Sequence, residues 1–223
     1  FQIFHSTAAV NKKEERELCL NILATKPGTM IYSESEEERA KMMKELDLDF
    51  FVCGWSRYEL DEYISEKTLA GMIYHGIGVK PSYWRDNHPR LNIRFVEGIY
   101  RMDQLRSHGV DKELVLTGFT KLDPLFSQNP SFDEKLAQSL GLDPSKKTIL
   151  FAPTFYPSSL ERFGMKLGEY TQNYNVILKP HMWTYFLDKF GEYNLVPQRN
   201  LAYDLADKFS HIKLLGPEVY NIT

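Results

Sequence analysis

The chain has 223 residues, of which 43% are hydrophobic and 26% charged, a composition that is ordinary for a soluble globular protein. Its length is sufficient for one large domain or two small ones. The formal net charge of −3 gives no general argument for nucleic acid or an anionic membrane as a partner, and we expect no nucleic-acid binding. No apolar run approaches the roughly 20 residues that span a bilayer.

Short apolar runs alternate with amphipathic segments, a rhythm that predicts β–α–β units and parallel sheets. In the first half we expect strands at residues 1–4, 29–32, 50–53, 69–74, 93–96 and 113–116, with helices near 58–64 and 100–108. Two further helices are expected to begin at capping boxes, one at Asn11–Glu14 and one at Ser35 with Glu38 three residues on. Gly109 is expected to end the helix near 100–108.

The sequence changes character over residues 127–147, which contain a proline, a predicted helix at 132–140 and a glycine break. We interpret this segment as a linker or hinge. It separates an N-terminal domain, residues 1–126, from a C-terminal domain, residues 148–223. In the second domain the predicted strands are residues 148–151, 175–178 and 212–215.

The most informative residue is His75, which follows the apolar run 69–74 and precedes Gly76, Gly78 and Lys80. The run predicts a buried strand and the glycines a tight turn, so the histidine is expected where the strand leaves the core. Glycine lets the backbone approach a ligand closely, and the lysine adds positive charge. A general base, accessible backbone and a cation together suit chemistry on a phosphate-bearing substrate.

Three further predicted strand ends carry chemically capable residues: Thr117-Gly118, Pro153-Thr154 and Lys179-Pro180-His181. In open α/β sheets, ligands bind beyond the carboxyl ends of the strands. For Thr117, Gly118 and Thr154 taken singly, ordinary turn and capping chemistry is the preferred interpretation. Lys179 and His181 are less ordinary, because two groups that can carry charge flank a rigid proline. Together the strand ends of the two halves predict a cleft between two domains.

Several other features favour structural interpretations. His5, His88, His108 and His211 have no partners at metal-ligand spacing and no Cys-x-x-Cys pair occurs, so we predict no metal site. Walker, Gly-x-Gly-x-x-Gly and Gly-x-Ser-x-Gly motifs are absent. A basic and aromatic cluster favours a solvated loop slightly over a site for acceptor phosphates or membrane headgroups; its acceptor-binding candidates are Arg85, Arg90 and Arg94.

Four motifs follow one another along the chain: His75-Gly76-x-x-x-Lys80, Gly118-Phe119-Thr120-Lys121-Leu122-Asp123, Pro153-Thr154-Phe155 and Lys179-Pro180-His181. In their order and spacing, residues 50–183 resemble the CDP-glycerol glycerophosphotransferases that build teichoic acids, and their relatives in capsule synthesis. Four positions depart from the family pattern. Ile77 stands in place of a threonine and Thr120 in place of a proline, and Lys121 and Tyr156 each stand in place of an arginine.

The resemblance implies an α/β fold of the GT-B type, with two Rossmann-like parallel-sheet domains facing a cleft, the first binding the acceptor and the second the donor nucleotide. The family's Asp-x-Ser-Ser segment would lie beyond Thr223, so the second domain is expected to be incomplete in this chain. His75 is implied as the catalytic base and His181 as a catalytic contact to the donor phosphates. Further donor or phosphate contacts are expected from Gly76, Gly78, Lys80, Gly118, Lys121, Pro153, Thr154 and Lys179.

The expected function is transfer of glycerol phosphate, or a related polyol phosphate, from a CDP-activated donor to a hydroxyl of a teichoic-acid or capsule-type acceptor. His75 would take the hydroxyl proton, while Lys179 and His181 stabilise charge on the departing CMP. No cofactor is required, although Mg²⁺ could accompany the donor. The acceptor would be lipid-linked, which implies a cytoplasmic enzyme in peripheral contact with the inner face of the cell membrane.

Two alternatives stay open. Residues 113–118 followed by Asp123 also resemble UDP-N-acetylglucosamine 2-epimerases and other GT-B sugar-nucleotide glycosyltransferases, which use a UDP-sugar in place of a CDP-polyol. The chain could instead be a non-catalytic acceptor-binding module: the absence of the Asp-x-Ser-Ser donor segment favours that interpretation, and the presence of both His75 and His181 argues weakly against it.

Overall fold

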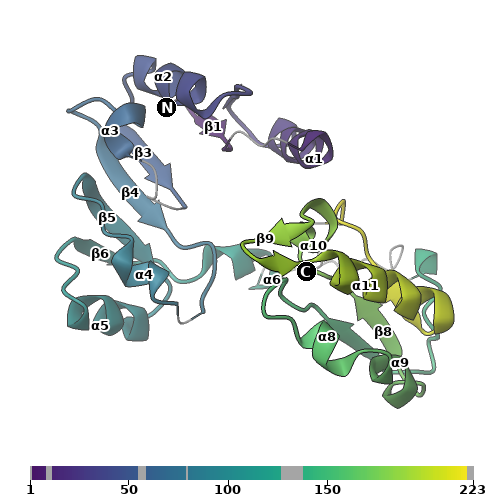
Figure 1. Ribbon diagram of the computed structural model, residues 1–223. Helices are drawn as coiled ribbons and strands as arrows, with labels where there is room; N and C mark the ends of the chain where they lie inside the picture. The colour runs from purple at the N-terminus through teal and green to yellow at the C-terminus, as the bar shows by residue number, and fades with distance from the viewer. Residues whose placement is uncertain (1, 9–11, 55–58, 79, 127–137, 220–223) are drawn as a thin grey trace. The chain divides into compact units, whose positions relative to one another are not determined.

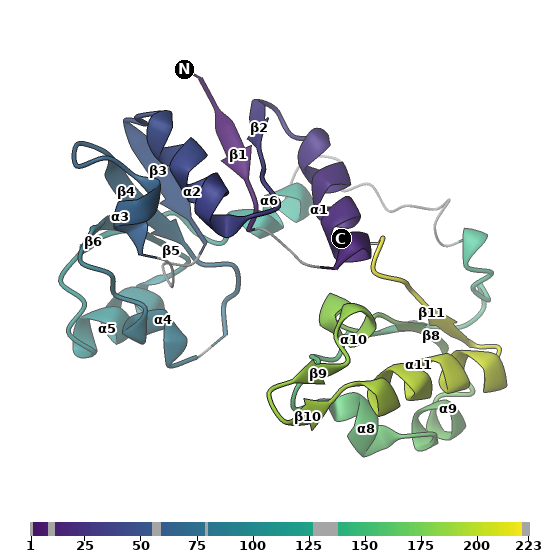
Figure 2. The same ribbon diagram turned by 45° about the horizontal axis from the view of Figure 1, so that its top comes forward.

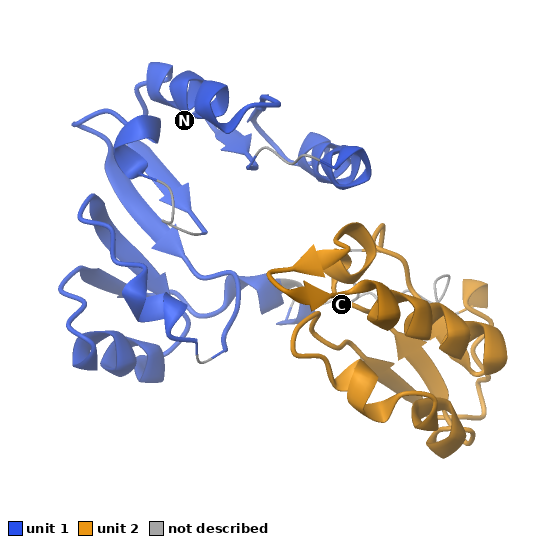
Figure 3. Cartoon of the chain, viewed as in Figure 1, with its two compact units in different colours: residues 1–130 blue, residues 131–223 orange. Residues whose placement is uncertain are grey.

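The computed structural model describes residues 2–8, 12–54, 59–78, 80–126 and 138–219 (Figure 1). The chain divides into two compact units, residues 1–130 and 131–223 (Figure 3), and each is described by itself below. The division falls inside the segment 127–147 that we interpreted as a linker. Most of the helix predicted at 132–140 lies outside the described residues.

Unit 1 is built on two parallel sheets. The larger has the strand order β3-β4-β5-β6, and the smaller pairs β1 with β2, which lie side by side in Figure 2. The strands are β1 (Phe4–Ser6), β2 (Thr29–Ile31), β3 (Phe50–Cys53), β4 (Leu69–Ile73), β5 (Leu91–Val96) and β6 (Glu113–Leu116). The parallel α/β class predicted from the sequence is therefore confirmed. The first strand is shifted, because regular pairing begins only at Phe4.

The helices of unit 1 are α1 (Lys13–Ala24), α2 (Glu36–Glu45), α3 (Leu60–Tyr63), α4 (Ser82–Arg85), α5 (Ile99–Ser107) and α6 (Asp123–Phe126), with a 3₁₀ turn η1 at Thr120–Leu122. Apolar side chains of α2, α3 and α5 pack with those of β4 and β5 in one core. Ala70, Val96 and Leu105 have no exposed surface at all. This core fixes the edge of the sheet from which the site residues emerge.

Helix ends in unit 1 follow the capping rules in part. The Ser35 hydroxyl accepts the Glu38 N–H at 3.4 Å, as predicted, but the Glu38 carboxylate accepts from Ser33 Oγ at 2.5 Å in place of closing the box. At α1 the first cap position is Lys12, which makes no side-chain cap bond, and Asn11 lies outside the described residues. The predicted stop of α5 is confirmed, because Gly109 takes a φ of +78°.

Unit 2 contains a three-stranded parallel sheet in the order β11-β8-β7. The strands are β7 (Thr148–Phe151), β8 (Asn175–Leu178) and β11 (Ile212–Leu214), with a small hairpin of β9 (Lys189–Phe190) and β10 (Tyr193–Asn194). The helices are α8 (Ser159–Phe163), α9 (Lys166–Tyr170), α10 (Met182–Phe186) and α11 (Val196–Lys208). All three predicted strands of this half are confirmed.

Close packing in unit 2 depends on one glycine. A Cβ placed on Gly168, in α9, would lie 2.2 Å from the ring of Phe209, so no side chain larger than hydrogen fits there without moving the ring. Phe209 packs against the core of the sheet with Val176, Leu178 and Leu205. The glycine therefore lets α9 and the end of α11 pack closely over the sheet.

Arg94 corrects the interpretation of the basic and aromatic cluster as a solvated loop. Its side chain, on the central strand β5, is 0% exposed. Its guanidinium donates to the Tyr74 hydroxyl at 2.7 Å and to the backbone oxygens of Tyr83 and Asp86 at 3.0 and 2.6 Å. It also donates to Asn87 Oδ1 at 2.9 Å. Arg94 thus holds the chain that follows β4, and it is too buried to meet an acceptor phosphate.

The other two arginines of the cluster differ from Arg94. Arg90 donates to the Asp61 carboxylate at 2.7 Å and to the Ser65 oxygen at 2.8 Å, so its guanidinium also joins segments of unit 1. Arg85, at the end of α4, is exposed. Of the three candidates for acceptor binding, Arg94 is buried, Arg90 is half-buried and Arg85 is exposed.

We expect Arg94→Leu to destabilise unit 1 by about 3 kcal/mol or more, because it leaves several buried acceptors without their donor. The matched variant Arg85→Leu, on an exposed position of the same cluster, should stay within about 0.5 kcal/mol of the unsubstituted protein. Urea unfolding followed by circular dichroism measures both. Equal stability of the two variants would contradict the clamp assigned to Arg94.

Candidate functional site

The carboxyl ends of β4, β5 and β6 enclose a pocket of about 320 Å³ in unit 1. It brings His75, which follows β4, together with Gly118 and Lys121, which both follow β6. The reason is topological: neighbouring parallel strands deliver their following loops to the same edge of the sheet. The pocket is lined by Ile73, Tyr74, His75, Phe95, Glu97, Gly118, Phe119, Thr120 and Lys121.

The side chain of His75 is exposed, and only Tyr74 separates this residue from the end of β4 at Ile73. Its ring lies edge-to-face with the ring of Tyr83, with 6.2 Å between centroids, and the buried Tyr83 in turn contacts Tyr74 at 5.0 Å. Gly76 leaves room beside it, since a Cβ at that position would lie 3.1 Å from the Tyr83 hydroxyl and the tyrosine would have to shift by a few tenths of an ångström. The imidazole is therefore exposed on one side and supported by aromatic rings on the other.

Arg101, on α5, anchors the glycine-rich loop after His75. It donates to the backbone oxygen of Gly78 at 2.7 Å and to the Glu97 carboxylate at 2.9 Å. Its guanidinium lies over the Tyr83 ring at 4.5 Å, and its side chain is 3% exposed. A buried cation of this kind costs free energy unless it is paired, so the loop position and the Glu97 pairing depend on each other. Lys80, two residues beyond Gly78, is exposed.

Burial shapes the protonation of the two tyrosines beneath the loop. Desolvation raises the pKa of Tyr74, while the neighbouring Arg94 acts in the opposite direction. Desolvation likewise raises the pKa of Tyr83, with Arg101 opposing it. Both phenols therefore keep their protons at neutral pH. The Tyr74 hydroxyl donates a hydrogen bond to the backbone oxygen of Tyr83 at 3.2 Å.

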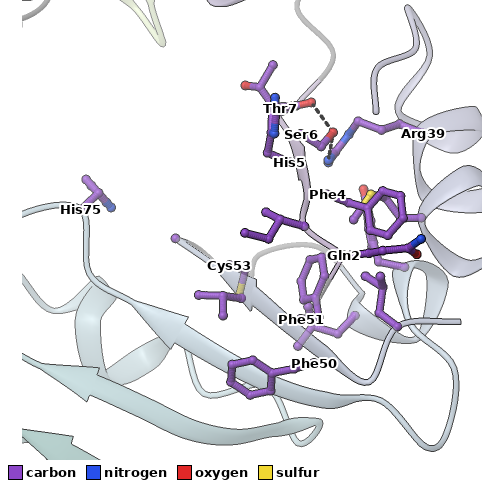
Figure 4. A pocket seen from close by; sticks show the side chains of 18 residues that line it. Gln2, Phe4, His5, Ser6, Thr7, Arg39, Phe50, Phe51, Cys53 and His75 are labelled. Carbon is purple, nitrogen blue, oxygen red and sulfur yellow. Dashed lines mark hydrogen bonds between the residues drawn. The ribbon is translucent and has the colours of Figure 1, made fainter. Parts of the chain in front are cut away.

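A second, larger pocket of about 760 Å³ separates β1 from β3 and also reaches His75 (Figure 4). Its walls are mainly apolar, with the rings of Phe4, Phe50 and Phe51, whereas Ser6 accepts from Arg39 at 3.2 Å on the side away from His75. This pocket was not predicted from the sequence. No local motif marks it, because it arises from the way the small β1–β2 sheet stands beside the larger one.

In unit 2 the residues after β7 and β8 form the second group of predicted site residues. Pro153 is buried and Thr154 exposed, and the Thr154 backbone oxygen accepts from Gln198 at 3.4 Å. Lys179 is half-buried and its backbone N–H donates to Phe151 at 2.9 Å. Desolvation lowers the pKa of the Lys179 ammonium, and the charge of Glu218 opposes this effect. The lysine is a partly desolvated cation at the carboxyl edge of the sheet.

His181 has a defined orientation. Its Nδ1 accepts the Trp183 backbone N–H at 3.1 Å and so caps α10. A neutral imidazole that accepts through Nδ1 carries its proton on Nε2, which makes Nε2–H a donor. The ring also lies 4.8 Å from the ring of Phe155, between centroids, and 5.6 Å from that of Trp183.

Phe155, Trp183 and Phe190 form an aromatic cluster around His181. Phe155 meets Trp183 at 4.9 Å and Phe190 at 5.0 Å between ring centroids. In the sequence, Phe155 was identified only as part of the Pro153-Thr154-Phe155 motif, and the aromatic cluster was not predicted. The density of aromatic residues after β7 and β8 was the available signal, but the hairpin that carries Phe190 could not be placed beside them from the sequence.

In the described parts of the chain, no group of three or more His, Cys, Asp or Glu side chains is arranged to hold a metal ion. No helix in those parts combines the length and the apolar character needed to cross a membrane.

A protein-family model described as CDP-glycerol:poly(glycerophosphate) glycerophosphotransferase matches residues 94–195, slightly less than half of the chain. The matched segment begins in β5 and includes Gly118, Lys121, Thr154, Lys179 and His181, whereas His75 precedes it. No curated protein matches the chain significantly. The match confirms the resemblance seen in the sequence motifs.

Two substitutions at His181 separate the effect of its cap bond to Trp183 from the effect of its ring contact with Phe155. Asn keeps an acceptor for the Trp183 N–H, whereas Ala does not, and both lose the ring contact with Phe155. We expect His181→Ala to be less stable than His181→Asn by about 1 kcal/mol, the usual worth of a cap. Chemical denaturation of the two variants measures the difference, and identical midpoints would contradict the cap.

Proposed function

We propose that this protein is an enzyme that transfers a glycerol-phosphate or related polyol-phosphate unit to a hydroxyl of a teichoic-acid or capsule-type acceptor. Its residues 94–195 match the CDP-glycerol:poly(glycerophosphate) glycerophosphotransferase family. The observation that carries the proposal is the family match, which includes both Lys179 and His181. The geometry of unit 1 adds support, because it gathers His75, Gly118 and Lys121 around one pocket.

The reaction requires an acceptor hydroxyl to attack the β-phosphorus of the CDP-activated donor. A new P–O bond forms, the bond between the β-phosphorus and the bridging oxygen breaks, and CMP leaves with that oxygen. His75 would accept the proton of the attacking hydroxyl, a step worth about 10²–10⁴ in rate. Its exposure and the small residue beside it allow a substrate to approach the ring.

The residues of unit 2 would bind the donor phosphates. The Lys179 ammonium and the Nε2–H of His181 are donors at one sheet edge, with Thr154 at the end of the neighbouring strand. Charge-assisted hydrogen bonds from such groups are strongest to anionic oxygens and would stabilise the charge that develops on CMP. Positioning and electrostatics of this kind supply most of the rate in phosphoryl transfer.

The finer assignments belong to the same proposal. The donor would be CDP-glycerol or a similar CDP-polyol, and any Mg²⁺ would arrive with its diphosphate. The acceptor would be lipid-linked, so that the cytoplasmic enzyme works at the inner face of the membrane. Gly76, Gly78 and Lys80 would contribute backbone and charge beside His75, and exposed Arg85 would be the remaining basic contact to the acceptor.

We expect His75→Ala to lower acceptor-dependent CMP release by about 10²–10⁴-fold. His108→Ala, which removes an exposed histidine at the far end of α5, should change it less than about twofold. The assay mixes the purified protein, CDP-glycerol and a lipid-linked acceptor and follows CMP. Unchanged release by His75→Ala would remove the base from the proposal, and turnover of a UDP-sugar with none of CDP-glycerol would overturn the proposed donor.

Lys179→Met tests the desolvated cation. We expect CDP to bind about 10–100-fold more weakly, as for loss of one charge-assisted hydrogen bond. Because the folded state lowers the pKa of Lys179, the unsubstituted protein is destabilised by this group at neutral pH and regains stability as pH rises through the lowered pKa toward the unfolded value.

Lys179→Met should therefore be at least as stable as the unsubstituted protein at pH 7 and should lose that gain at alkaline pH. Isothermal titration with CDP and thermal unfolding at pH 7 and 10 measure the two effects. Lys166→Met, which removes an exposed lysine of α9, is the control and should change neither. Undiminished CDP affinity in Lys179→Met would contradict the assignment.

A further inference from the structure

Glu97 is a carboxylate of the His75 pocket to which the function proposed above gives no part. It follows β5 directly and lines the 320 Å³ pocket together with His75 and Lys121. Its two oxygens have different environments. Oε1 accepts from Arg101 Nε at 2.9 Å, whereas Oε2 is buried and has no hydrogen-bond partner among the described residues.

The neighbouring cation does not supply the missing donor to Oε2. The other guanidinium nitrogens of Arg101 donate to Gln104 Oε1 at 2.5 Å and to the Gly78 oxygen at 2.7 Å, so each of its three nitrogens already has an acceptor other than Oε2. Buried polar atoms in native proteins are nearly always hydrogen-bonded, and an unpaired one at a pocket is a place where a ligand donor gains free energy. The described residues therefore supply no donor to Oε2, and a ligand that carries a donor can supply one.

The pocket restricts what that donor belongs to. At about 320 Å³ it lies at the lower end of the range for small-molecule sites, which suits one polyol unit better than a nucleotide. A carboxylate oxygen accepts from a neutral hydroxyl, while the Lys121 ammonium on the same pocket attracts an anion. A molecule that carries hydroxyls next to a phosphate satisfies both groups at once.

We propose that Glu97 is a substrate-binding residue that accepts a hydrogen bond from the acceptor's terminal polyol-phosphate unit. The bonded hydroxyl is the one beside the attacking hydroxyl, and the phosphate of the same unit lies toward Lys121. Glu97 thereby orients the attacking oxygen toward His75 and selects acceptors that end in a vicinal diol. This inference rests on the proposed function and names the acceptor chemistry of its site.

The decisive comparison uses two soluble acceptors that differ by one hydroxyl, one ending in glycerol phosphate and one ending in 1,3-propanediol phosphate. We expect the unsubstituted protein to prefer the glycerol end in kcat/KM by on the order of tenfold or more, because a site built for a hydroxyl rejects the analogue that lacks it. In Glu97→Gln and Glu97→Ala the preference should fall toward one. Glu113→Gln, which alters an exposed carboxylate on β6, should keep the full preference.

Binding without the donor separates this inference from the proposed function. Saturation-transfer NMR with glycerol phosphate and with propanediol phosphate reports affinity even where no transfer occurs. Glu97-dependent discrimination without any CMP release would support the binding residue and overturn the transferase assignment. Equal preference in the unsubstituted protein and both Glu97 variants, by rate and by binding, would overturn the role of Glu97. Folding of each variant is checked by thermal unfolding, and the isosteric Glu97→Gln is decisive if Glu97→Ala is unfolded.

Discussion

The geometry of unit 1 depends on two buried guanidinium groups that hold the chain after β4. Arg94 reaches from the inner strand β5 to the backbone oxygens of Tyr83, within α4, and Asp86, directly after it, and Arg101 reaches from α5 to Gly78. His75 lies on the segment between these attachments and β4. Each arginine is expensive to bury and is stabilised only if its hydrogen-bond acceptors stay in place, so the loop position and the arginine burial are coupled. The exposed imidazole thus has a supported backbone.

In unit 2, too, polar site residues are held in place by the surrounding fold, here a lysine and a histidine. Lys179 loses part of its hydration at the carboxyl end of β8, and His181 is oriented by the Trp183 backbone and by aromatic rings. Groups of this kind reduce the reorganisation that a substrate must induce, at some expense in stability. The family match spans the segment from β5 to β10 and so includes parts of both units. His75 lies before it, and its connection to the matched residues is the shared pocket with Gly118 and Lys121.

Particular elements show why the sequence could predict the fold but only part of the site. The strands at 50–53, 113–116 and 175–178 appear as predicted, because apolar runs bounded by turn residues report burial directly. The stop at Gly109 was equally local, since a positive φ favours glycine. The burial of Arg94 could not be predicted from its neighbours in the sequence. Its neighbours Arg85 and Arg90 gave it the pattern of a basic surface loop, and only the acceptors at 74, 83 and 86 make its burial favourable.

The amino-acid sequence by itself determined the parallel α/β class, the order of the strands along the chain, the family resemblance and the positions of His75, Lys121, Lys179 and His181 at strand ends. The tertiary structure decided that His75 and Lys121 share a pocket, that Glu97 lines the same pocket with one oxygen unpaired among the described residues, and that Arg94 and Arg101 are buried. The physical reason is the distance along the chain over which each kind of interaction acts. Strand and turn preferences act over a few neighbouring residues, whereas burial and hydrogen-bond satisfaction depend on segments that only folding brings together.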